Sequence, residues 1–189
     1  MPKIINDEQI FQAIIETITD YGYSGATTRQ IAETAGISEV TLFRKFTNKA
    51  SMVNSAVAAM IKNIDFESAT QYSGDIRSDL IRVIDAYQAT VVTHSRFFLL
   101  LINEMKLHPE LAGLMNGPTE LIYSIGKLLN QYQSEGILRK EHPLHAAASL
   151  LGPLIFMAMI NNTITENKLP VLDLNFHVDF FLKGRLNEA

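Results

Sequence analysis

The sequence predicts an all-α protein, because apolar residues recur at helical spacing along the whole chain and no segment alternates like a half-buried strand. Two short segments near the N-terminus carry their own helix-start signals, and longer apolar stripes follow them. We therefore expect an N-terminal three-helix domain at residues 1–48 and a helical C-terminal domain at residues 49–189.

The composition is that of a soluble globular protein, with 47% hydrophobic and 19% charged residues among 189. The chain has no cysteine, which excludes disulfides, thiol catalysis and thiolate metal sites. Asp7 and Glu8 appear before any apolar stretch reaches the length of a signal peptide. We therefore expect a cytoplasmic protein.

The first three predicted helices have clear boundaries. Asn6 caps the first helix, with Gln9 three residues later, and Gly22 is expected to end it. The second and third helices have the following signals: a capping box of Thr27 and Gln30, a turn at Gly36, a cap at Ser38 and a hydrophobic staple from Ile37 to Leu42.

A long linker helix is expected next, capped by Thr47 or Asn48 and running to residue 64, followed by a polar loop at 67–79. Apolar periodicity then predicts the remaining helices, at residues 76–94, 96–107, 109–115, 119–134, 143–163 and 173–186.

The segment 27–46 has the layout of a helix-turn-helix, in which one short helix enters the major groove of DNA and the other braces it. If Leu42 and Phe46 point inward, then Val40, Phe43 and Arg44 share the exposed face. Apolar groups can contact thymine methyl groups and an arginine can bind guanine. The alternative is that these are ordinary surface residues of a helical hairpin.

The charge pattern supports a local DNA-binding patch. The chain has a net charge of −4, so it is not expected to coat nucleic acid indiscriminately. Between residues 29 and 49, however, the four basic side chains Arg29, Arg44, Lys45 and Lys49 outnumber the two acidic ones by two.

The first fifty residues resemble the DNA-binding domain of the tetracycline-repressor (TetR) family of transcriptional regulators. The residues that carry this resemblance are Gly22, Tyr23, Thr27, Thr28, Ile31, Ala32, Ala35 to Ser38, Thr41 to Phe46 and Lys49. The rest of the chain resembles the family only in length and helical layout. The resemblance implies a regulator, expected to be a repressor, that binds double-stranded operator DNA and responds to a small-molecule effector.

The resemblance also implies roles for individual residues. Thr28 and Lys49 occupy positions that contact phosphate near helix N-termini, and Arg29 is expected to do likewise. The positions that meet bases and backbone are Thr41, Phe43, Arg44 and Lys45.

Three residues depart from the usual family pattern. Phe43 stands where tyrosine is common, Lys45 stands where histidine is common, and Val40 replaces a frequent glycine. The first change removes a hydroxyl contact to phosphate, and the second retains a phosphate role. Glu39 could accept a hydrogen bond from cytosine, although it more simply complements the helix dipole.

The C-terminal half predicts a homodimer. Residues 143–160 are almost entirely apolar and approach the length of a membrane span, but no aromatic belt or positive-inside pattern flanks them. A helix that is apolar all round can instead meet its own core on one side and a partner subunit on the other. We expect the interface to use this helix and the last one, which offers Leu174, Phe176, Val178, Phe180, Phe181 and Leu182.

The helices between residues 76 and 160 carry a mixture of aromatic, methionine and polar residues that suits an apolar effector pocket. The candidates are Tyr87, His94, Phe97, Phe98, Met105, Tyr123, Met157 and Asn161. Each of them could equally belong to a plain core. The resemblance implies that an apolar or amphipathic effector shifts the helices after the linker helix and moves the recognition helices out of register.

The sequence gives little support for an enzyme or for a cofactor. The closest metal-like group, His142 with His145 and Glu141, reads more simply as a polar helix start, and Glu104 with His108 reads as a surface pair. No phosphate-binding loop or nucleophile elbow is present. The alternatives left open are a helical ligand-binding protein without specific DNA binding and a small enzyme on a helical fold.

Overall fold

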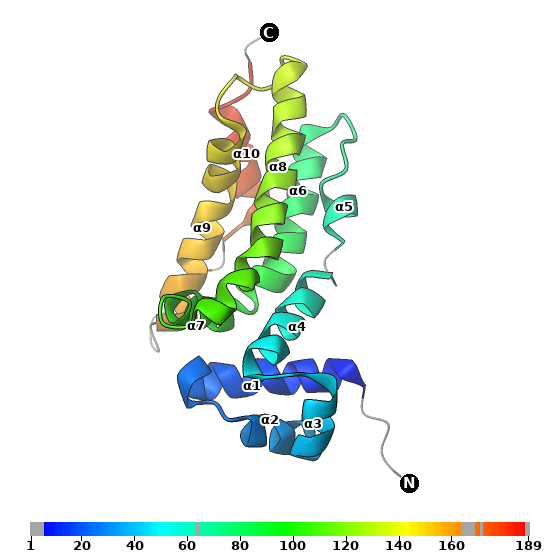
Figure 1. The fold of residues 1–189 in the computed structure, drawn as a ribbon. Coiled ribbons are helices and arrows are strands. Elements are labelled where there is room, and N and C mark those ends of the chain that lie inside the picture. The colour runs from blue at the N-terminus through cyan, green and yellow to red at the C-terminus, as the bar shows by residue number, and fades with distance from the viewer. Residues whose placement is uncertain (1–5, 63–64, 164–168, 171, 188–189) are drawn as a thin grey trace. The chain divides into compact units, whose positions relative to one another are not determined.

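The computed structural model describes residues 6–62, 65–163, 169–170 and 172–187 (Figure 1). Within these residues it is helical, and its β-structure is limited to an isolated bridge between Leu138 and Leu186. The predicted all-α class is confirmed. The chain divides into two compact units, the first formed by Met1–Asn63 with Arg96–Met115 and the second by Ile64–Ser95 with Asn116–Ala189.

The first unit begins with four helices, of which α2 and α3 lie on one side of α1 (Figure 1). They are α1 (Asp7–Gly25), α2 (Thr28–Ala35), α3 (Glu39–Lys45) and α4 (Lys49–Lys62). The predicted caps at Asn6, Thr27 and Ser38 are confirmed, and Thr27 and Gln30 form a complete capping box. Because each cap satisfies backbone N–H groups of the first turn, even these short helices have defined starts.

Two glycines have positive φ angles in this unit. Gly36 adopts the left-handed conformation, with φ of 68°, and turns the chain between α2 and α3 as predicted. Gly22 also has a positive φ, of 71°, but it kinks α1 instead of ending it, and the helix resumes as far as Gly25. The predicted end at Gly22 is therefore wrong by one turn. The linker helix is described to Lys62, and residues 63–64 lie outside the described residues.

A later part of the chain completes the core of the first unit. Helix α7 (Ser95–Glu104) and the 3₁₀ helix η2 (Pro109–Met115) contribute buried side chains to the same cluster as α1 and α4. These side chains are Phe97, Leu101, Leu111 and Leu114. The packing therefore does not divide at residue 48, because α4 and this later segment are needed to cover the apolar faces of the first helices.

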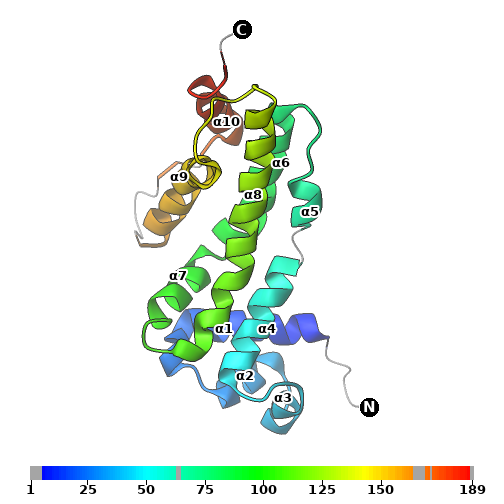
Figure 2. The same ribbon diagram turned by 45° about the horizontal axis from the view of Figure 1, so that its top comes forward.

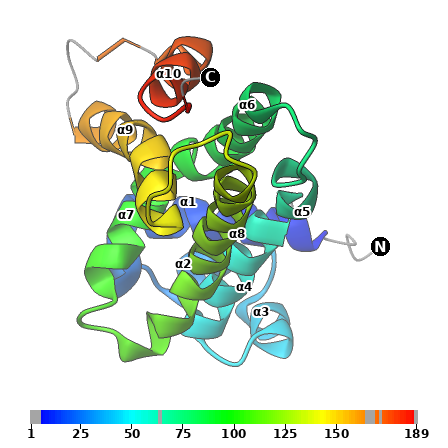
Figure 3. The same ribbon diagram turned by 90° about the horizontal axis from the view of Figure 1, so that it is seen from above.

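The second unit is built from long helices around its own core (Figures 2 and 3). Its elements are α5 (Phe66–Ala69), α6 (Ile76–Tyr87), the π-helix η1 (Gln88–Val92), α8 (Asn116–Ser134), α9 (Pro143–Thr163) and α10 (Leu174–Lys183). Helix α8 packs along α9, and α10 packs against both α6 and α9. The short α5 lies where a loop was predicted, and the predicted helix at 76–94 changes to π geometry at Gln88.

A buried carboxylate fixes the start of α6. Asp79 is fully buried, and its oxygens accept hydrogen bonds from the Tyr132 hydroxyl at 2.5 Å, from the Ser73 hydroxyl at 2.6 Å and from Arg82 at 2.9 Å. Burial by itself would raise the pKa of Asp79, but these donors hold it below its ordinary value. The carboxylate therefore joins α6, α8 and the preceding loop.

Asp79→Asn should lower the free energy of unfolding by about 2 kcal/mol at pH 7, because it removes the charge from a buried, hydrogen-bonded acceptor. The pKa of Asp79 is lowered in the folded state, so its contribution is present above the unfolded pKa of about 3.9 and is lost as the pH falls through the folded pKa. Urea unfolding between pH 7 and pH 3 measures this. Asp85→Asn, on the exposed side of α6, is the control, and an equal effect of both variants would contradict the role of Asp79.

Candidate DNA interface and ligand cavity

Helix α3 presents an apolar and basic face to solvent. Leu42 is fully buried, whereas Val40 is 79% exposed and Phe43 is 47% exposed. Arg44 is also exposed, and Phe46 packs partly against the core. The predicted inward and outward faces of this helix are confirmed. A large, exposed apolar surface on a seven-residue helix is costly in water, which indicates a face that is covered when the protein functions.

Helices α2 and α3 are joined on their polar side. The Thr28 hydroxyl donates a hydrogen bond to the carboxylate of Glu39, so both side chains are engaged across the turn. Arg29 forms an i,i+4 ion pair with Glu33 at 2.9 Å, in a position where both side chains are largely exposed. Exposed ion pairs contribute little to stability, so the guanidinium of Arg29 can exchange this partner for a phosphate at low cost.

The two basic residues at the end of α3 differ in their surroundings. Lys45 forms an ion pair with Asp7 at the start of α1. Among the described residues, Arg44 has no ion-pair partner. Thr41 shares a hydrogen bond of 2.9 Å with Ser38, the residue that caps the helix. Arg44 is therefore the cation of this face that is free to bind a base or a phosphate.

Lys49 is directed into the first unit. Its ammonium group donates hydrogen bonds to the backbone carbonyls of Tyr23 at 2.5 Å and Ala26 at 2.9 Å, and lies 4.4 Å from the centroid of the Tyr23 ring. Burial lowers the pKa of Lys49, while Glu104 and Glu110 act in the opposite direction. The side chain fixes the connection between α1 and α2, and its predicted phosphate contact stays a prediction.

A polar cluster joins the end of α1 to residues 104–110, which belong to the later segment of the first unit. The Ser24 hydroxyl lies 2.9 Å from the Glu104 carboxylate and 2.9 Å from Nε2 of His108. The Tyr23 ring packs edge-on to the His108 ring, and its hydroxyl donates to Glu110 at 3.4 Å. Burial and Glu110 raise the pKa of Tyr23 to about 12, so the hydroxyl remains a donor. Glu104 and His108, predicted as a surface pair, therefore also contact the C-terminal end of α1.

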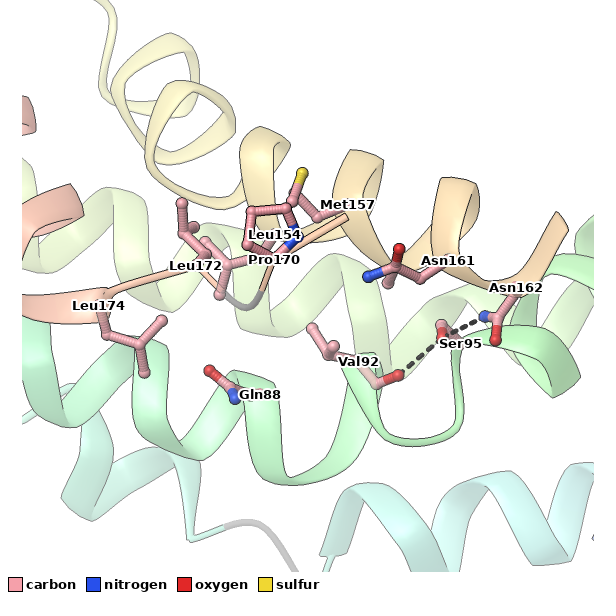
Figure 4. A pocket seen from close by; sticks show the side chains of 11 residues that line it. Gln88, Val92, Ser95, Leu154, Met157, Asn161, Asn162, Pro170, Leu172 and Leu174 are labelled. Carbon is pink, nitrogen blue, oxygen red and sulfur yellow. Dashed lines mark hydrogen bonds between the residues drawn. The ribbon is translucent and has the colours of Figure 1, made fainter. Parts of the chain in front are cut away.

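The second unit contains a cavity of about 230 Å³ at the π-helix (Figure 4). The described residues that line it are Gln88, Val92, Ser95, Leu154, Met157, Ala158, Asn161, Asn162, Pro170, Leu172 and Leu174. None of these side chains carries a charge, and none is aromatic. Asn161 exchanges two hydrogen bonds with the backbone of Leu169, and Asn162 donates to the Ser95 hydroxyl at 2.7 Å. Three of the four polar side chains in this list, those of Asn161, Asn162 and Ser95, are thus already engaged.

Only two of the predicted effector residues, Met157 and Asn161, line this cavity. Phe97, Phe98 and Met105 pack in or against the core of the first unit. Three others lie elsewhere in the second unit: Tyr87 in its core, His94 half-buried, and Tyr123 54% exposed. Gln88 was missed, and no sequence signal separates it from the many other polar residues of the predicted helix 76–94.

Comparison with known proteins supports the DNA-binding assignment. Residues 10–56 match the family model described as bacterial regulatory proteins of the tetR family. That match includes the whole of α2 and α3 with the turn between them. Residues 10–56 therefore form a helix-turn-helix DNA-binding domain of the TetR family. The predicted family is thereby confirmed, and so is the N-terminal position of the DNA-binding domain.

Relatives agree with this assignment. The HTH-type transcriptional regulator YvkB of Bacillus subtilis is 32% identical over 77 residues, which span 41% of this chain and 40% of that relative. The TetR-family regulator PfmR of Thermus thermophilus has a similar fold, with a TM-score of 0.71 and 16% identity over 92% of this chain and 97% of that one. A protein from Saccharomonospora viridis solved in complex with choline gives a TM-score of 0.77 and 18% identity, over 96% and 98%.

The chain leaves apolar faces exposed on its last two helices. On α9 these are Ile155, Phe156 and Met159, and on α10 the rings of Phe176 and Phe180 stack 6.1 Å apart, 66% and 69% exposed. The stretch Pro143–Asn162 is long and apolar enough to cross a membrane, but a third of it is buried within its own unit. His142, His145 and Glu141 do not form a metal-binding group, and the described residues contain no such group.

Proposed function

We propose that this regulator binds a pseudo-palindromic operator as a homodimer, represses transcription and leaves the operator when an uncharged small molecule occupies the cavity of the second unit. The observation that carries the proposal is the exposed face of α3, with Val40, Phe43 and Arg44, inside a domain that matches the TetR family. A cytoplasmic location follows from this role. The face is suited to the major groove, because a helix presents its side chains to base edges there.

The same geometry suggests how the backbone of DNA is held. Arg29 and Lys45 lie on α2 and α3, and each has an exposed acidic partner that it can exchange for a phosphate, whereas the Thr28 hydroxyl stays bonded to Glu39. We assign the two cations to phosphates and Arg44 to a base. Lys49 takes a positioning role, because its ammonium group is already bound by two carbonyls.

The homodimer is supported by the exposed apolar faces of α9 and α10. These helices are tied to each other by a hydrogen bond of 2.7 Å between His177 and the carbonyl of Leu150, so they form one surface. A second copy about a two-fold axis would cover Phe156, Phe176 and Phe180 and would present two recognition helices to two half-sites. Leu151, which lies within the apolar stretch expected at the interface, is 2% exposed and belongs to the core.

The cavity suggests the chemical class of the effector. A carboxylate would need a basic partner, and a quaternary ammonium ion would need an acidic or aromatic one. The lining offers aliphatic side chains and the amide of Gln88 instead, so we assign it to a neutral molecule with an apolar body and one or two hydrogen-bonding groups. The described lining residues include no acidic or aromatic side chain of the kind that a quaternary ammonium ion such as choline would need.

One helix connects the cavity with the DNA-binding unit along the chain. Ser95 lines the cavity and is the first residue of α7, whereas Glu104 at the end of α7 binds Ser24 beside α2. A ligand that moves the start of α7 therefore changes the support of the recognition helix. This coupling requires the ligand to bind the released conformation more tightly than the DNA-bound one.

Selection on random DNA duplexes with the purified protein should recover an enriched pseudo-palindrome whose binding weakens as salt rises. Arg44→Ala should cost about 1–3 kcal/mol in operator binding and relax the base preference at one position. Arg96→Ala, which removes an equally exposed arginine outside the helix-turn-helix, should leave affinity unchanged. If no sequence is enriched at low salt, the chain is a ligand-binding protein without specific DNA binding.

Replacing Phe176 and Phe180 together by glutamate should convert the dimer to a monomer in sedimentation velocity, since it buries charge in an apolar interface. Both side chains are exposed in the single chain, so the fold itself should survive, which circular dichroism checks. The control introduces the same two charges at Lys127 and Asn130 on α8, which are exposed and polar. A dimer that persists in the Phe variant would place the interface elsewhere.

A thermal-shift screen of neutral, acidic and cationic small molecules should yield neutral compounds that raise the melting temperature and weaken operator binding by about 5- to 150-fold. Met157→Trp fills the cavity wall and should blunt both effects. Asn130→Trp places the same side chain on an exposed surface and should blunt neither. Stabilising ligands that are all charged, or that leave operator affinity unchanged, would contradict the proposed effector site.

A further inference from the structure

We propose that the recognition helix reads thymine methyl groups through Val40 and Phe43, so that each operator half-site places thymines beneath these two side chains. The inference rests on the proposed operator binding and specifies its chemistry. Val40 and Phe43 stand three residues apart on α3 and therefore share one face. At 79% and 47% exposure they are its most prominent apolar groups.

The polar side chains that could compete for base edges are mostly engaged within the protein. The carboxylate of Glu39, which could otherwise accept from cytosine, binds the Thr28 hydroxyl. Lys45 is paired with Asp7, and the Thr41 hydroxyl is bonded to Ser38. The face is left with two apolar groups and the guanidinium of Arg44, so most of its surface cannot donate or accept a hydrogen bond.

This chemistry favours one unmodified base. Thymine alone among the four bases of DNA carries a methyl group in the major groove, whereas guanine, cytosine and adenine present hydrogen-bonding groups there. Covering those groups with Val40 or Phe43 would remove them from water without giving them a partner, which is unfavourable. Covering a methyl group is favourable because it removes apolar surface from water on both sides of the contact.

The test replaces thymine by deoxyuridine in the selected operator, one half-site position at a time. Deoxyuridine lacks only the methyl group and keeps the same base pairing. At positions beneath Val40 or Phe43 the dissociation constant should rise about fourfold per methyl group, the equivalent of one buried CH₂. Binding is measured by fluorescence anisotropy with the wild-type protein.

Matched variants locate the contact. In Val40→Ala and Phe43→Ala the affinity should become insensitive to deoxyuridine at one position each, while Arg44→Ala should keep the full sensitivity at both. All three side chains are exposed, and unchanged melting temperatures verify that the variants fold.

Two results are distinguishable from each other. An operator that is selected but binds equally well with thymine or deoxyuridine at every half-site position would overturn the methyl readout and leave operator binding intact. A selected operator whose half-sites contain no thymine would likewise overturn the methyl readout and leave operator binding intact. Selection that enriches no sequence would overturn the proposed function, and this inference with it.

Discussion

The arrangement of the DNA-binding helices depends on one ammonium group. Lys49 is the first residue of α4, and it binds the carbonyls of Tyr23 and Ala26 where the chain passes from α1 to α2. These carbonyls belong to a corner that helix geometry leaves without enough internal donors. By satisfying them from a third helix, Lys49 fixes the start of α2 and, through the turn at Gly36, the direction of α3. The same corner contains Ser24, whose partners are Glu104 at the end of α7 and His108 in the segment that follows it.

Much of the helix-turn-helix could be predicted from the sequence because its determinants are local. A cap and its partner stand three residues apart, and the inward and outward faces of α3 follow from helical periodicity alone. The position of Lys49 could not be predicted in this way, because its acceptors lie more than twenty residues earlier in the chain. The resemblance gave that residue a phosphate role, whereas long-range packing gives it internal partners.

The residues of the cavity could mostly not be predicted from the sequence. A mixture of aromatic and methionine residues is equally typical of a core and of a pocket, and Phe97, Phe98 and Met105 belong to a core. What distinguishes the cavity is a backbone feature, the π-helix at Gln88, together with the return of Leu172 and Leu174 from the end of the chain. Neither leaves a periodic signal in the sequence. The packing of α7 with the N-terminal helices could not be predicted either, because it joins residues that lie far apart in the sequence.

The ion pairs on the DNA-binding face have a consequence for the search for the operator. Arg29 and Lys45 carry their own acidic partners, Glu33 and Asp7, so a random DNA segment meets fewer unpaired cations than the sequence contains. Weak attraction to arbitrary phosphates shortens each non-specific encounter and lowers the fraction of the protein that is bound to non-specific DNA. In a chain with a net charge of −4, this pairing shifts discrimination away from general electrostatic attraction and toward the fit of α3 in one groove.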